Sequence, residues 1–144
     1  MKSVQTFDKS AFKFEGFIIN RTLFERKDGE IGHSYNIQFN IKATHYIKQN
    51  KYKLFVTTEI NDSNGCLTIN IDCTGSFSFN PECEEKILKN FFYVNAPAIL
   101  FPYIRAYIST ISVLSGYSVP ITIQTINFSS LTSNLEKNTI VIED

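Results

Sequence analysis

The segment Asn95–Leu131 reads NAPAILFPYIRAYISTISVLSGYSVPITIQTINFSSL, and it decides how this chain can fold. Its first part, Pro97–Leu114, is 18 residues long and carries one charge, Arg105. As a helix it would extend for about 27 Å at 1.5 Å per residue. One face of a sheet can cover only one side of such a helix. The other apolar side therefore needs a second copy of the protein or a ligand.

Length and composition indicate a single globular domain over residues 1–144. With 43% hydrophobic and 19% charged residues, the chain can bury a core without disulfides or metal ions. Fourteen basic residues balance fourteen acidic ones. The net charge therefore gives no case for binding to nucleic acid or to an anionic membrane.

The cysteines and the N-terminal sequence favour a cytoplasmic protein. The three cysteines lack CxxC spacing and are interpreted as reduced thiols. No basic segment followed by an apolar run opens the chain, so no secretory signal is expected. Pro97–Leu114 is shorter than the roughly 20 residues of a transmembrane helix, and Arg105 near its middle would cost about 2.5–3.5 kcal/mol in a bilayer. No membrane insertion is expected.

Four segments that precede this helix have the patterns of β-strands. The first is rich in aromatic and β-branched residues and can bend at Gly16, and two of the others alternate strictly between apolar and polar positions. The predicted strands are residues 12–26, 35–44, 52–60 and 67–79. Their short connections predict antiparallel neighbours, with one polar face open to solvent and one apolar face packed on helices.

The hydrophobic period changes at Asn80-Pro81. Asn80 can cap a helix and Pro81 suits its first turn. Helical spacing continues to about Tyr93, after which Asn95–Pro97 is predicted to restart the chain.

The long helix is predicted to begin near Phe101 or Pro102, because proline cannot donate a backbone hydrogen bond, and to stop at Gly116. A short second helix is predicted from the spacing of Phe128, Leu131 and Leu135. Residues 1–10 are predicted to be a mobile lead-in and residues 136–144 a tail. The predicted fold is α+β: a four-stranded antiparallel sheet with one polar open face, backed by a long and a short C-terminal helix.

The polar residues form no recognisable catalytic or metal-binding pattern. His33 lies beside a glycine turn and His45 at a strand end, without ExxH or HxH spacing. The serines lack a GxSxG elbow, and the glycines do not form a phosphate loop. We therefore predict a protein that is not an enzyme and that has no metal or cofactor.

Thirteen phenylalanines and seven tyrosines are an unusual feature of the composition. An aromatic core accounts for most of them, but a small domain has limited interior, so some can line a groove that contacts partners of varied sequence. An alternative is that single-stranded nucleic acid stacks on a basic and aromatic cluster formed by Tyr46, Lys48, Lys51, Tyr52, Lys53 and Phe55. The neutral net charge argues against this alternative.

The stretch Asn95–Arg105, NAPAILFPYIR, resembles the SecB family of protein-export chaperones. Members carry a run of the type N/C-x-P-x-x-L-F-P-Y-x-R, followed by a helix, a glycine break, a proline link and an NFxxL segment. Here the later features correspond to Gly116, Pro120 and Asn127–Leu131. The strand that ends in Thr74–Phe79 also resembles the GxFxI strand of the family. The resemblance spans about residues 12–131.

The resemblance implies a dimer of dimers with the long helices in the middle, and no catalytic activity or cofactor. It also implies apolar grooves that hold unfolded polypeptides competent for export through the SecA motor. The positions expected at the assembly interface are Arg105, Ser109 and Ser112. The positions expected in the peptide groove are Phe101, Tyr103 and Phe128.

The charge pattern departs from that of typical family members, which are acidic and present carboxylates on the open sheet face to SecA. This chain is neutral, and its polar face carries chiefly Glu59 and Asp72 as acids, which are the positions expected to contact SecA. The prediction is an ATP-independent holdase for unfolded preproteins. The alternatives are a chaperone dedicated to one client, such as an antitoxin, or a non-chaperone ligand-binding or scaffolding module on the same fold.

Overall fold

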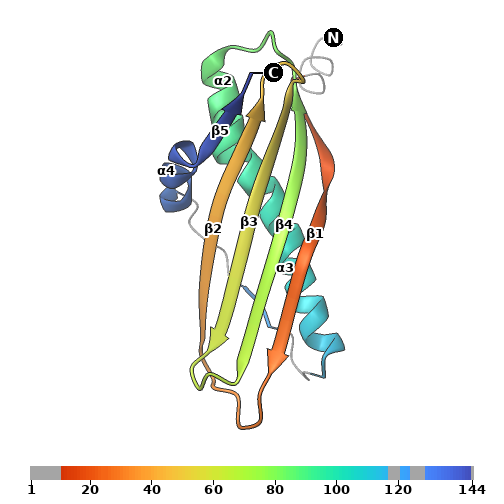
Figure 1. The fold of residues 1–144 in the computed structure, drawn as a ribbon, viewed down its shortest axis with the longest axis vertical. Coiled ribbons are helices and arrows are strands. Elements are labelled where there is room, and N and C mark those ends of the chain that lie inside the picture. Colours follow the sequence, from red (N-terminus) through yellow and green to blue (C-terminus); the bar gives the residue numbers. More distant parts are fainter. Residues whose placement is uncertain (1–10, 117–120, 124–128, 144) are drawn as a thin grey trace, which may run out of the picture.

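The computed structural model describes residues 11–116, 121–123 and 129–143, with the backbone alone for residues 129–132. One sheet forms a layer, and the long helix crosses one of its faces (Figure 1). The strands are β1 (Phe12–Arg26), β2 (Tyr35–Tyr46), β3 (Lys51–Asp62), β4 (Leu67–Phe79) and β5 (Thr139–Ile142). The helices are α2 (Glu85–Asn90), a π-helical turn (Phe91–Asn95), α3 (Ala96–Leu114) and α4 (Ser129–Lys137).

The sheet has the order β1-β4-β3-β2-β5. The pairs β2–β3 and β3–β4 are antiparallel neighbours as predicted, whereas β1 pairs antiparallel with β4 and not with β2, the strand that follows it in the chain. The expected bend in β1 is confirmed. Its register shifts between Phe14 and Gly16 and again between Ile19 and Arg21, and Gly16 has a φ of +113°, which favours glycine.

The prediction of four strands is wrong, because the sheet has a fifth. Residues 136–144 were expected to be a tail, yet α4 continues to Lys137 and β5 pairs in parallel with the free edge of β2, from Ala43 opposite Thr139 to Tyr46 opposite Ile142. The strand reads TIVI, four β-branched residues that suit a pleated edge. Its pairing fills hydrogen-bonding positions that β2 would otherwise leave open.

The apolar face of the sheet and the inner face of the long helix form the core. β4 alternates strictly between buried and half-buried residues, as the sequence pattern predicts. The largest fully buried side chains of this core include Tyr52, Leu54, Ile60, Ile69, Ile71, Phe77, Leu100, Ile104 and Ile108. A Cβ at Gly75 would lie 3.0 Å from Leu100 Cδ2, so this glycine allows α3 to approach β4 closely.

The predicted restart at Asn95–Pro97 is also wrong, because Glu85–Leu114 is one helix of 30 residues. The π-helical turn lets the helix continue through Pro97. The Ala96 N–H bonds to the carbonyl of Phe91, five residues back. The next bond of that kind would need an N–H from Pro97, which has none. The hydroxyl of Tyr52 instead donates to the Phe92 carbonyl at 3.0 Å.

The start of this helix also differs from the prediction. Its N-cap is Glu84 rather than Asn80, and the Asn80 side-chain oxygen accepts a hydrogen bond from Glu82 N at 2.9 Å in a turn that precedes the helix. By length and composition alone, Glu85–Leu114 could cross a membrane, but in the fold one face of it packs on the sheet.

Candidate functional site

Exposed and half-buried aromatic rings gather where α3 passes over the β1 edge of the sheet. The Tyr103 ring lies 5.5 Å from the Phe14 ring and 4.9 Å from the Phe17 ring, between centroids. Tyr103 is 44% exposed and Phe17 37%. One helical turn later, the Tyr107 hydroxyl lies 2.8 Å from Thr22 Oγ1 and ties the helix to β1. We call Phe14, Phe17, Tyr103 and Tyr107 the aromatic shelf.

Phe101 was expected beside Tyr103 in a peptide groove, but the two lie on different sides of α3. Residues two apart on a helix point about 200° apart. Phe101 is buried, its ring lies edge-on to Phe39 of β2 at 5.4 Å, and the Arg105 guanidinium is 5.8 Å from the Phe101 ring centroid. The third expected groove residue, Phe128, lies outside the described residues.

Ser109 and Ser112 were expected at an assembly interface, and both bond within the chain. Ser109 Oγ donates to the Ile121 carbonyl at 3.0 Å, and the Ile121 N–H donates to Ser112 Oγ at 2.9 Å. Ser112 Oγ donates in turn to the Ser109 carbonyl at 2.8 Å. Ser112 is fully buried. Its side chain therefore holds Ile121 against α3 and offers no surface to a partner.

The accessible side of α3 is a different set of residues. They recur mostly at four-residue intervals and are small or apolar: Ala98, Pro102, Ala106, Thr110, Val113 and Leu114, which we call the outer stripe. A shallow hollow of about 320 Å³ lies at its C-terminal end between Ser109, Thr110, Val113 and Leu114. Leu114 is 80% exposed. The spacing is visible in the sequence, but which side faces the sheet follows only from packing.

Glu59 and Asp72, expected to contact a partner, both lie on the polar open face. Asp72 Oδ1 accepts a hydrogen bond from Thr57 at 3.1 Å, and Glu59 is half-buried opposite Asn70. The two carboxylates therefore lie in adjacent cross-strand rows. The stacking cluster suggested for nucleic acid does not form as expected, because Tyr52 is fully buried on the other face.

His45 lies among aromatic rings, and the three cysteines are free thiols. His45 lies edge-on to Phe79 and Phe92 at 5.1 and 4.8 Å, and burial lowers its pKa. All three cysteines are free, and burial raises the pKa of Cys73 to about 11. Among the described residues, no three His, Cys, Asp or Glu side chains gather as a candidate metal site.

Sequence comparison identifies the family. Residues 21–138 match SecB, described as preprotein translocase subunit SecB. The chain belongs to the SecB family. It is 28% identical over 140 residues to an uncharacterised protein of Methanocaldococcus jannaschii, covering 90% of this chain and 87% of that relative. The protein-export protein SecB of Roseobacter denitrificans is 29% identical over 103 residues, which are 68% of this chain and 61% of that protein.

Solved structures show the same fold. A SecB-like chaperone of Mycobacterium tuberculosis, solved in complex with an antitoxin peptide, aligns with a TM-score of 0.66 at 12% identity, over 83% of this chain and 90% of that one. A protein of unknown function from Streptococcus agalactiae aligns with a TM-score of 0.51 at 8% identity, over 79% and 97%. The resemblance to SecB that Asn95–Arg105 indicates is thus confirmed, and the chain is a divergent SecB-like member.

Proposed function

We propose that this SecB-like protein is an ATP-independent holdase that binds unfolded polypeptides on the aromatic shelf. The observation that carries the proposal is the pair of rings Phe17 and Tyr103, which touch each other and remain more than one third exposed. Unfolded chains offer large apolar side chains, and burying one contributes about 1.5–3 kcal/mol. Flat aromatic rings accept such side chains without demanding a particular sequence.

The edge position of the shelf suits an extended client. β1 is the last strand on its side of the described sheet, so the backbone groups of its outer edge have no strand beside them. Two register shifts interrupt this edge, and a client strand could pair with it only over short stretches. Side-chain burial on the shelf is therefore the main source of affinity in this proposal. Binding of this kind needs no nucleotide, cofactor or catalytic group.

The outer stripe is proposed as the surface that copies of the chain bury against one another, giving a homotetramer built as a dimer of dimers. Small side chains allow two helices to approach closely, and the stripe has no charged residue to desolvate. Ala106→Glu would place a charge at its centre. By light scattering, the wild type should have the mass of four 16.5-kDa chains. Ala106→Glu should be smaller, and Asn40→Glu on the open face should be unchanged.

The partner that receives the client is proposed to be SecA, as for an export chaperone in the cytoplasm. Glu59 and Asp72 on the open face are the proposed contacts. The antitoxin peptide bound to the Mycobacterium tuberculosis neighbour favours a second candidate, a chaperone dedicated to one client. A pulldown with SecA separates them. Binding lost in a Glu59→Gln, Asp72→Asn variant supports export, and no binding by the wild type supports the dedicated role.

An aggregation assay tests the holdase proposal. The wild type should delay the aggregation of a chemically unfolded protein without ATP, as measured by light scattering. Phe17→Ala with Tyr103→Ala should weaken the delay, whereas Tyr35→Ala should not. Tyr35 is a matched control, because it is an aromatic residue with the same 37% exposure as Phe17 and lies at the start of β2. A non-chaperone scaffolding module would show no delay in any variant.

A further inference from the structure

The open face of the sheet is divided by charge along its length. The strand register aligns its side chains in rows across β1, β4, β3 and β2. At the end where β2 finishes and β3 begins (top of Figure 1), the charged groups of three rows are Lys13, Lys42, Lys51, Lys53 and one carboxylate, Glu15. In the next three rows the charged side chains are Arg21, Glu25, Glu59 and Asp72. One half of this face is basic and the other half acidic.

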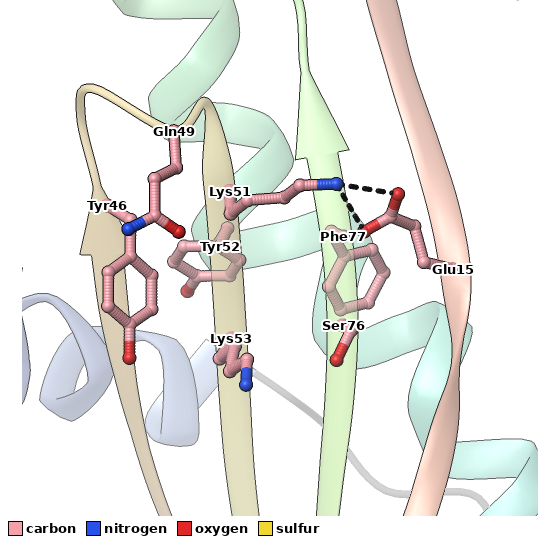
Figure 2. Close-up of a pocket in the computed structure, with 8 residues that line it drawn as sticks. All are labelled: Glu15, Tyr46, Gln49, Lys51, Tyr52, Lys53, Ser76 and Phe77. Atoms are coloured by element: carbon pink, nitrogen blue, oxygen red, sulfur yellow. Dashed lines mark hydrogen bonds and ion pairs between the residues drawn. The ribbon is translucent and has the colours of Figure 1, made fainter.

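The basic half contains a pocket. It has a volume of about 340 Å³, and its lining includes Tyr46, Gln49, Lys51, Lys53 and Ser76. Figure 2 shows the Lys51 side chain reaching across β4 towards Glu15, while Lys53 and Ser76 lie beside one another on neighbouring strands. The pocket therefore combines two ammonium groups with hydroxyl and amide donors, a set that suits a carboxylate.

The ion pair between Lys51 and Glu15 shows what this pocket accepts. Lys51 Nζ donates to both carboxylate oxygens of Glu15, at 2.8 and 2.9 Å. The two side chains remain 41% and 28% exposed, and an ion pair in such a position is weak. A carboxylate from another chain can therefore share or take the place of Glu15. Lys53 has no ion-pair partner among the residues that the structure describes, so its charge is available.

We propose that this basic half is a docking site for an acidic, extended segment of a partner polypeptide. Alternate carboxylates of such a segment meet Lys51, Lys53 and Lys42, because alternate side chains of an extended chain point to the same side. The site lies on the opposite face of the sheet from the aromatic shelf. A client and an acidic partner can therefore bind at the same time.

A nucleic acid strand fits this surface less well than a peptide. Its regular phosphates would meet the carboxylate of Glu15 in the pocket and, beyond three rows, the acidic half of the face. Stacking platforms are also few here, because the ring of Tyr52 is buried on the helix side. A peptide can place its carboxylates only where the lysines are. Its sequence can end, or continue with uncharged polar residues, before it reaches the acidic rows.

Fluorescence anisotropy and ¹⁵N NMR test the proposal with a labelled serine-rich peptide that carries alternate glutamates. The peptide should bind in a salt-dependent way and shift the amides of Lys51, Lys53 and Ser76. The matched glutamine peptide should not bind. Lys42→Glu with Lys53→Glu should weaken binding about tenfold or more, and Glu15→Gln should strengthen it about threefold by releasing Lys51.

Matched controls make the result decisive. Lys42 and Lys53 are exposed, so the thermal unfolding of the double variant should match that of the wild type. Asn40→Glu, on β2 outside the basic rows, should retain most of the peptide affinity. Equal binding of the two peptides, NMR shifts elsewhere, or no effect of the double charge reversal would overturn the proposal. Tighter binding of a single-stranded oligonucleotide by the same lysines would overturn the choice of partner. None of these readouts depends on holdase activity.

Discussion

Replacing Tyr52 with phenylalanine removes the hydrogen bond that completes the long helix at its π-helical turn. The Tyr52 hydroxyl donates to the Phe92 carbonyl at 3.0 Å, in a position where the helix itself offers no donor because Pro97 lacks an N–H. Tyr52 is fully buried, and burial raises the pKa of its hydroxyl, which therefore remains a donor at any ordinary pH. The substitution leaves the Phe92 carbonyl without this partner.

The expected cost is about 1–3 kcal/mol, the range for a buried group left unsatisfied. Packing should contribute little to it, because phenylalanine keeps the ring that stacks on Phe92 with 4.1 Å between centroids. Urea unfolding at fixed protein concentration measures the change, since assembly couples stability to concentration. The m-value should stay constant.

Tyr107→Phe is the matched control. It removes a tyrosine hydroxyl that lies 2.8 Å from Thr22 Oγ1 in an exposed position, where the expected cost is below about 0.5 kcal/mol. Equal losses in Tyr52→Phe and Tyr107→Phe would refute the idea that the Tyr52 hydroxyl compensates for Pro97.

Two further changes test the loops that Asp62 holds and the contact between α3 and β4. Hydrogen bonds from backbone N–H groups, first that of Gly32, hold the pKa of Asp62 below its ordinary value. Asp62 therefore stabilises the fold at pH values above the ordinary pKa of a carboxyl group, and this effect is lost as the pH falls through the lowered pKa. Acid unfolding monitored by circular dichroism should be less pH-dependent in Asp62→Asn, which should also be less stable at neutral pH; an unchanged acid limb would contradict this role. Gly75→Ala should cost about 1–3 kcal/mol in thermal unfolding, because its Cβ would lie 3.0 Å from Leu100 Cδ2, and a neutral result would mean that α3 can shift away.

The first four strands were predictable because each depends on a pattern of neighbouring residues in the sequence. Alternation at residues 35–44 and 67–79 gives one apolar and one polar face in any register, and the structure has that arrangement. β5 was missed, although Thr139–Ile142 is a β-branched run, because its flanking charged residues resemble a tail. Its pairing with β2 depends on α4 returning the chain to that edge, which no local pattern specifies.

The continuous helix could not be predicted for a similar reason. Pro97 and Pro102 are strong breakers by local rules, and the donor that replaces the missing N–H comes from Tyr52, 40 residues away from Phe92 in the sequence. Only one ring of the aromatic shelf was singled out from the sequence. The motif pointed to Tyr103. Phe14 and Phe17 lie on β1, where the register shifts around Gly16 decide which side chains face the helix.

Site-specific photo-crosslinking tests the central claim most directly, by asking whether an unfolded client lies on the aromatic shelf. A photoreactive phenylalanine analogue at position 17 should crosslink to a permanently unfolded protein, and excess unlabelled unfolded chain should suppress the product. The same analogue at position 35, where Tyr35 has equal exposure, should give little product. Equal crosslinking at the two positions, or none at position 17, would contradict the proposed client site.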